Sequence, residues 1–143
     1  MPHPAPSPDV MQSLASAARA ARSMAYARYS NFAVGAALLD EQGRIHAGCN
    51  IENAAYPQGL CAEASALAHL VMAGGKRVIA ALVVGEAKEP VTPCGGCRQK
   101  LREFAADDAP IWSADANSIT ARHTLGELLP ASFGPKHLKD QSA

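Results

Sequence analysis

The sequence has few aromatic residues and no excess of charge of either sign. It contains one tryptophan, three tyrosines and three phenylalanines, although 48% of its 143 residues are hydrophobic. Its abundant alanine suits helices packed closely on a sheet. The thirteen basic residues equal the thirteen acidic ones, and neither sign forms a long run. Because nucleic-acid-binding proteins usually carry a basic stripe, we expect no nucleic-acid partner.

Targeting and membrane-spanning segments are also missing from the pattern. The proline-rich start has no charged and apolar stretch typical of a signal peptide. No apolar run approaches the ~20 residues needed to cross a membrane, so we expect no membrane partner. Four cysteines are present, and three of them share the motif described below, which leaves Cys49 unpaired. This arithmetic favours a reducing, cytoplasmic location over a disulfide scaffold.

Length and patterning predict a disordered tail over residues 1–8 and a single domain over residues 9–143. Ser7-Pro8 is a helix-start signal, and the helix that it opens is expected to end near Ala27. Further helices are predicted from Cys61 to Ala73, from Pro93-Cys94 to about Phe104, and from a capping box at Thr124–Glu127 to Pro130. Strands are predicted at Phe32–Leu39, Arg44–Cys49, Val78–Val84, Ile111–Ser113 and Ile119–His123. Strands alternating with helices predict a three-layer α/β/α domain.

The chemistry is concentrated in two short stretches, Cys61-Ala62-Glu63 and Thr92-Pro-Cys-Gly-Gly-Cys-Arg-Gln99. Three thiols with one acid that is not a ligand are typical of a catalytic zinc site, because a structural site normally has a fourth ligand. The pattern C-x-E followed by P-C-x-x-C is typical of zinc deaminases. Cys61, Cys94 and Cys97 are therefore the candidate ligands of one Zn²⁺, and Glu63 is the candidate proton carrier. Each thiol is placed near a helix start, where partial positive charge favours the thiolate.

The alternative is a structural zinc site or a set of buried thiols. That interpretation lacks a fourth ligand, because Cys49 falls in a strand and no histidine stands at ligand spacing. Glu63 alone would be an ordinary first-turn acid, but two residues after a zinc ligand it gains a task in proton transfer.

Five motifs stand along the chain in a fixed order: Y-S-N-F-A-V-G-A-A-L from Tyr29, G-C-N-I-E-N-A-A-Y-P from Gly48, C-A-E, P-C-G-G-C-R-Q and E-L-L-P from Glu127. Together they resemble the small, homotetrameric cytidine deaminases. The resemblance covers about Tyr26 to Leu138, and the N-I-E-N block separates this family from other zinc deaminases. It implies a cytidine-deaminase-like fold with a mixed sheet of about five strands. It also implies conversion of cytidine and 2′-deoxycytidine to the uridine nucleosides and ammonia, in pyrimidine salvage.

The resemblance also implies how substrate is bound. Asn50 and Glu52 would hold the ribose hydroxyls, Phe32 would pack against the nucleoside, and the Ala62 backbone would contact the base. Phe133 would stack on a base bound in a neighbouring subunit of a homotetramer. Tyr56 is grouped with these residues, with a place at the subunit interface expected for it.

Two positions depart from the family pattern, Ala33 in place of a proline and Ala64 in place of an arginine after the glutamate. That arginine offsets the negative charge of three thiolates, and Arg98 is the nearest cation in sequence that could replace it. Two rival functions stay open: a deaminase of another aminopyrimidine such as blasticidin S, and a zinc-stabilised interaction module without catalysis.

Overall fold

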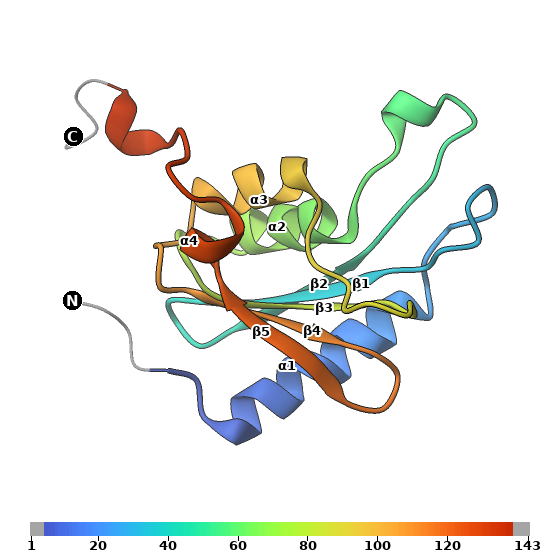
Figure 1. The fold of residues 1–143 in the computed structure, drawn as a ribbon, viewed down its shortest axis with the longest axis horizontal. Coiled ribbons are helices and arrows are strands. Elements are labelled where there is room, and N and C mark those ends of the chain that lie inside the picture. The colour runs from blue at the N-terminus through green and yellow to red at the C-terminus, as the bar shows by residue number, and fades with distance from the viewer. Residues whose placement is uncertain (1–4, 139–143) are drawn as a thin grey trace.

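A mixed sheet of five strands forms the centre of the structure, a computed structural model that describes residues 5–138 (Figure 1). The spatial order is β2-β1-β3-β4-β5, in which β3 and β4 are parallel and all other neighbours are antiparallel. The strands are β1 (Gly35–Asp40), β2 (Ile45–Cys49), β3 (Val78–Val84), β4 (Pro110–Ala114) and β5 (Ile119–Thr124). The predicted mixed sheet of about five strands is confirmed.

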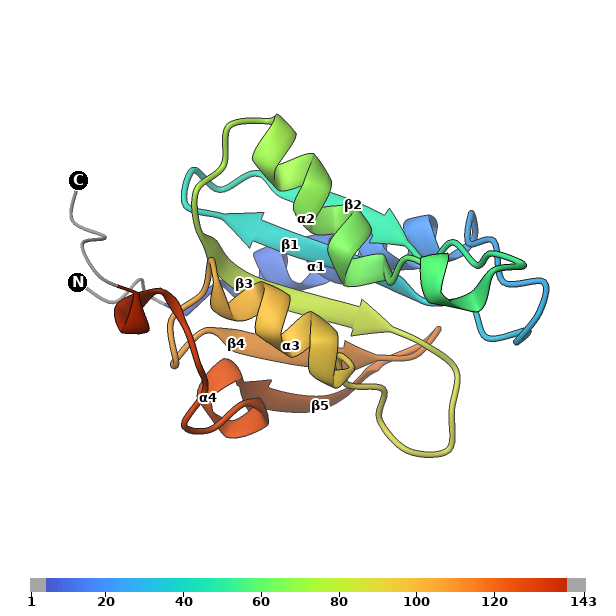
Figure 2. The same cartoon turned by 90° about the horizontal axis from the view of Figure 1, so that it is seen from above.

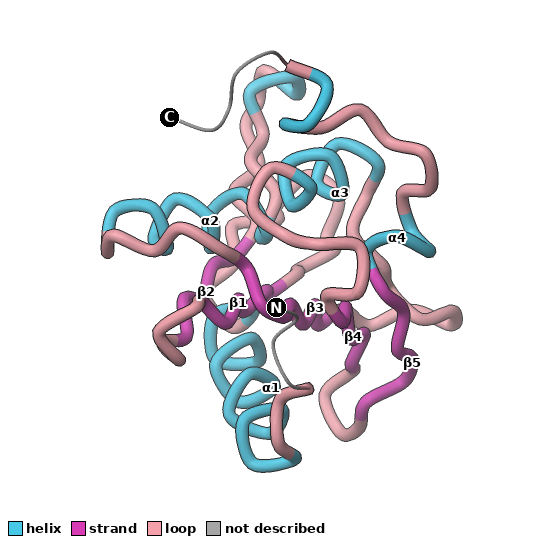
Figure 3. Tube along the Cα trace, turned by 90° about the vertical axis from the view of Figure 1, so that its left-hand side faces the viewer, coloured by secondary structure: helices cyan, strands magenta, loops and turns pink. Residues whose placement is uncertain are grey.

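Helices cover both faces of this sheet, which confirms the three-layer prediction. They are α1 (Pro8–Arg22), α2 (Ala62–Met72), α3 (Gly95–Arg102) and α4 (Leu125–Leu128), with 3₁₀ turns η1 (Tyr56–Gln58) and η2 (Pro135–His137). Figure 3 shows α1 alone on one face and α2, α3 and α4 on the other. Each interface has its own apolar core, one around Leu14 and Leu82 and the other around Leu38 and Leu70. The continuous apolar run of β3 is therefore buried from two sides, as expected for a central strand.

Helix α1 begins as predicted but ends earlier. The Ser7 hydroxyl caps it by accepting a hydrogen bond from the Val10 N–H at 3.3 Å. The predicted end near Ala27 is wrong, because the backbone of Tyr26 pairs instead with the segment after β2. Its N–H donates to the Asn50 carbonyl at 3.0 Å, and its carbonyl accepts from the Glu52 N–H at 2.8 Å. A tertiary contact thus overrides the alanine-rich helical pattern.

The other boundaries differ from prediction by small amounts with local causes. β1 begins at Gly35 and not at Phe32, because the preceding residues bond to the side chain of Asn50. Helix α3 ends at Arg102, two residues before the predicted Phe104. The capping box between Thr124 and Glu127 is present and opens α4.

Two further sequence predictions concern a disordered N-terminal tail and membrane-spanning segments. The predicted tail over residues 1–8 falls partly outside the described residues, and Pro8 is already the first residue of α1. None of the helices in residues 5–138 has the length and apolar character needed to cross a membrane.

Helix α2 lies unusually close to β2 because Gly48 has no side chain. A β-carbon at this position would lie 2.4 Å from the backbone nitrogen of Ala66 and 2.7 Å from the carbonyl oxygen of Ala62, both in α2. A glycine is therefore required for α2 to pack this closely on β2. This packing fixes the position of the first residues of α2 relative to the sheet.

The β1–β2 turn is held by the buried carboxylate of Asp40. Its Oδ1 accepts from the N–H groups of Gln42 and Arg44, both at 2.9 Å. Its Oδ2 lies 2.8 Å from His46 Nε2 and accepts from Arg44 Nε at 2.7 Å. Burial acts to raise the pKa of Asp40, but the bonds from His46 and Arg44 and the Gln42 N–H outweigh it and lower the pKa to about 2.

Candidate functional site

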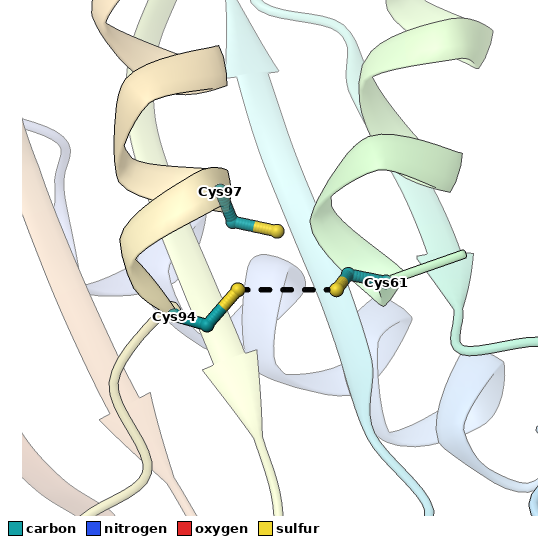
Figure 4. Close-up of side chains that lie close together, drawn as sticks. All are labelled: Cys61, Cys94 and Cys97. Atoms are coloured by element: carbon teal, nitrogen blue, oxygen red, sulfur yellow. Dashed lines mark hydrogen bonds between the residues drawn. The ribbon is translucent and has the colours of Figure 1, made fainter. Parts of the chain in front are cut away.

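Three thiols meet where α2 and α3 begin. Cys61 is the N-cap of α2, Cys94 is the N-cap of α3, and Cys97 lies in the first turn of α3. Their Sγ atoms all lie within 4.8 Å of one another, and those of Cys61 and Cys94 are 3.9 Å apart (Figure 4). The two helices run side by side on one face of the sheet (Figure 2), so two distant stretches of sequence form one cluster.

The electrostatics of this cluster favour a bound cation. Burial is the main cause of a raised pKa at both Cys61 and Cys97, and the Glu63 carboxylate raises both further. Burial acts in the same direction at Cys94, but hydrogen bonds from the Cys97 N–H and the two other thiols lower the pKa of Cys94. Deprotonating all three thiols beside a carboxylate requires a compensating positive charge, which a divalent metal supplies.

The donor set fits zinc. Three thiolates are ligands that Zn²⁺ prefers, and three protein ligands leave one position of a tetrahedron open. In residues 5–138, no further His, Cys, Asp or Glu belongs to the cluster. This arrangement matches a catalytic site better than a structural one, because a structural site would have a fourth protein ligand.

Glu63 is the second residue of α2 and is only 5% exposed. Burial raises the pKa of Glu63, and its own backbone N–H and the charge of Lys100 partly oppose this effect. With Cys61 and Cys94 it lines a cavity of about 180 Å³. A buried carboxyl group with a raised pKa is suited to accept and release protons near neutral pH.

Three of the predicted substrate-binding residues, Phe32, Asn50 and Ala62, line this same cavity. The Asn50 amide is held at both ends: Oδ1 accepts from the Val34 N–H and Nδ2 donates to the Phe32 carbonyl, both at 2.9 Å. An amide oxygen has two lone pairs and an amide nitrogen two hydrogens. Each end of Asn50 therefore keeps one position for a ligand.

The remaining predicted residues lie outside this cavity. Glu52 and Tyr56 line a neighbouring cavity of about 390 Å³ together with Tyr29 and Ser30. The loops before β1 and around η1 project beyond one end of the sheet (Figures 1 and 2). These two loops supply the residues that line this neighbouring cavity. Phe133 is 60% exposed, lines neither cavity and stacks on the ring of His137 at 5.1 Å between centroids.

Arg98, the nearest cation in sequence, is used within the scaffold. Its guanidinium donates to the Pro93 carbonyl at 2.6 Å, the Leu128 carbonyl at 2.8 Å and the Thr92 hydroxyl at 2.9 Å. These bonds fasten the chain just before Cys94 to the end of α4. A role for Arg98 in offsetting the thiolate charge stays a prediction.

The sequence pattern did not identify every residue that lines the cavity. Val34, Val83, Val91 and Thr92 also line it. For Val83, the sequence predicts only a place in a buried strand. The available signal was its place near the carboxyl end of β3, since ligands in α/β sheets bind outside the carboxyl ends of parallel strands.

Comparison with known proteins agrees with this geometry. The family description "Cytidine and deoxycytidylate deaminase zinc-binding region" matches residues 9–112. A cytidine deaminase of Sporosarcina psychrophila is 40% identical over 128 residues, which span 90% of this chain and 94% of that protein. One from Halalkalibacterium halodurans is 41% identical over 120 residues, spanning 84% and 91%.

Solved structures show the same likeness. The crystal structure of cytidine deaminase from Burkholderia pseudomallei has a TM-score of 0.80 at 41% identity, covering 85% of this chain and 98% of that one. The enzyme from Mycobacterium tuberculosis has a TM-score of 0.76 at 39% identity, covering 87% and 97%. Given the three-thiol cluster, the buried glutamate and these similarities, the chain belongs to the cytidine and deoxycytidylate deaminase family.

Proposed function

We propose that the protein hydrolyses cytidine and 2′-deoxycytidine to uridine and 2′-deoxyuridine with release of ammonia. The observation that carries this proposal is the buried Glu63 carboxyl group in a small cavity that Cys61 and Cys94 also line. This geometry supports a role for Glu63 as a proton carrier beside a metal site with one open position. Similarity to cytidine deaminases along most of the chain supports the choice of substrate.

When bound by the three thiolates, zinc supplies Lewis-acid activation of water near neutral pH. Glu63 takes a proton from the attacking water and delivers it to N3 of the base. Addition of the water oxygen at C4 gives a tetrahedral intermediate. Glu63 then takes the hydroxyl proton of this intermediate and passes it to the amino group. The C4–N bond breaks, ammonia leaves and the C4 carbonyl of the uridine product forms. The raised pKa of Glu63 suits both steps, because its carboxyl group must bind and release a proton in each turnover.

The cavity walls suggest how the nucleoside is held. Phe32 offers an aromatic surface, Asn50 one free donor and one free acceptor, and Ala62 a backbone at the cavity wall. Glu52 lines the neighbouring cavity and not the one that holds Glu63, which supports a role in binding the sugar rather than the reacting base. A site that hydrogen-bonds sugar hydroxyls rejects analogues without them, because its polar groups would stay unpaired.

Assembly and location are part of the same proposal. We infer a homotetramer in which Phe133 of one subunit completes the site of another, and a cytoplasmic enzyme of pyrimidine salvage. Phe133 is exposed and lines neither the cavity of Glu63 nor that of Glu52 in its own chain, which supports this inference.

A panel of cytidine, 2′-deoxycytidine, cytosine, cytidine monophosphate and blasticidin S tests the function, with ammonia release as the readout and zinc content measured alongside. We expect turnover of the two nucleosides, little turnover of free cytosine, and one zinc per chain. Preference for blasticidin S would assign the protein to another aminopyrimidine. A zinc-loaded protein inactive on every compound would be an interaction module.

A further inference from the structure

One hydroxyl group joins Glu52 to the loop that carries Phe32. Glu52 Oε1 accepts from the backbone N–H groups of Tyr29 at 2.8 Å and Ser30 at 3.0 Å. Its Oε2 accepts from the Ser30 hydroxyl. The same hydroxyl oxygen accepts from the Phe32 N–H at 3.0 Å. Ser30 thus uses its hydroxyl as donor and acceptor at once.

These bonds restrict what Glu52 can offer to a ligand. An ionised carboxylate only accepts hydrogen bonds and has about four acceptor positions. Three are occupied by Tyr29 and Ser30, which leaves one on Oε2. The bonds from the Ser30 side chain and backbone also lower the pKa of Glu52, which favours its ionised form.

The loop between these groups has a defined backbone shape. Asn31 has a φ of 58°, in the left-handed region that asparagine tolerates better than most residues. This conformation brings the Phe32 N–H back onto the Ser30 oxygen. Because that N–H takes a lone pair of the oxygen, the hydroxyl hydrogen is directed to Glu52.

We propose that Ser30 is a positioning residue for nucleoside binding, which holds the Glu52 carboxylate with a single acceptor position free for one sugar hydroxyl. The proposal rests on the proposed function. It assigns a role to a side chain that lines the Glu52 cavity and whose hydroxyl group is hydrogen-bonded to Glu52 and Phe32.

The first test compares Ser30→Ala, Ser30→Thr and the parent on cytidine. Loss of one hydrogen bond to a charged group should raise KM about ten-fold while kcat changes little, since the bond acts in binding. Ser30→Thr keeps the hydroxyl and should restore KM. Ser118→Ala is the matched control, because that hydroxyl also contacts a carboxylate, Asp115 at 3.4 Å, but lines neither cavity.

The second test is a double-mutant cycle with Glu52→Ala, using the dissociation constant of uridine by calorimetry so that inactive variants still report. Ser30→Ala should have almost no effect once Glu52 is removed. A full ten-fold loss in that background, an unchanged KM in Ser30→Ala, or loss of zinc or folding in Ser30→Ala would each overturn the proposal. A parent inactive on cytidine would instead refute the proposed function.

Discussion

Burial of the Glu63 side chain raises the pKa of its carboxyl group, which its position in a helical first turn alone would not do. Acids are common in the first turn of a helix, where they usually face solvent. Here the side chain is buried, and this burial raises its pKa. A surface acid at the same helix position would hold its proton less well near neutral pH and would be a poorer shuttle.

Glu63→Gln keeps the size of the side chain but removes its ability to carry protons. Turnover of cytidine should fall by roughly 10²- to 10⁴-fold, while zinc content and uridine binding stay near the parent values. Glu103→Gln, at the exposed C-cap of α3, is the control and should be fully active. Near-normal turnover in Glu63→Gln would remove this residue from the mechanism.

The site residues differ in how far the sequence could identify them. The thiols and Glu63 stand in short motifs at helix starts, so spacing alone indicated their chemistry. Asn50 and Glu52 look like ordinary loop polars, and only the family resemblance indicated a role for them. The contact between Ser30 and Glu52 joins residues 22 positions apart in two irregular loops, which no periodicity reports.

At the scale of elements, the start of α2 depends on its contact with β2. Gly48 lets the helix lie against the strand, and this contact sets the position of Cys61 relative to Cys94. Periodicity predicted both elements, but it could not predict a close approach between them, because that depends on backbone distance rather than on hydrophobicity. The early end of α1 has the same origin in a contact between distant segments.

Gly48→Ala should therefore move α2 and weaken the metal site. The added β-carbon would meet backbone atoms, which cannot yield as a flexible side chain can. We expect zinc content and activity to fall together, with a lower melting temperature. Gly95→Ala, between the ligands of α3, meets nothing within 4 Å and is the control that should keep zinc. Full zinc occupancy in Gly48→Ala would contradict this account.

The Asp40 carboxylate in the β1–β2 turn should make the free energy of unfolding depend on pH in the acid range. The pKa of Asp40 is lowered when folded, so its contribution is complete above the ordinary value near 3.8 and is lost as pH falls through about 2. Such a shift corresponds to about 2 kcal/mol. Asp40→Asn should lose that amount at neutral pH, and its deficit against the parent should shrink as pH falls from 4 to 2. Urea unfolding at several pH values measures the gap, and a constant gap would contradict the prediction.

At the scale of the whole molecule, the chain carries an aromatic side chain that lines neither of the two cavities described above. Phe133 lies on the segment after α4, and its carbonyl accepts from Gln99 Nε2 at 2.9 Å, which ties this segment to α3. The side chain itself remains exposed. The sequence pattern around Phe133 is compatible with a core position and with an interface position, because hydrophobic periodicity does not distinguish the two.

Phe133→Ala tests the proposed assembly. Base–aromatic stacking contributes roughly 1–3 kcal/mol, so the dissociation constant for uridine should rise about ten-fold or more if Phe133 reaches a neighbour's site. Sedimentation should show a tetramer for the parent. Leu138→Ala, another exposed apolar residue of this segment, serves as the control. A parent that is fully active as a monomer would refute the assembly.

The proximity of the Cys61 and Cys94 sulfurs has a consequence for the protein without its metal. Their Sγ atoms lie 3.9 Å apart, and both cysteines are free of disulfides. An oxidant such as peroxide can remove two electrons from this pair, release both thiol protons and join the sulfurs as a disulfide. Protein stripped by a chelator and then oxidised should take up zinc only after treatment with a thiol reductant, and Cys49→Ala should behave the same way. Zinc uptake by the oxidised protein without reductant would contradict this prediction. If the prediction holds, bound metal protects the thiols from oxidation in the loaded protein.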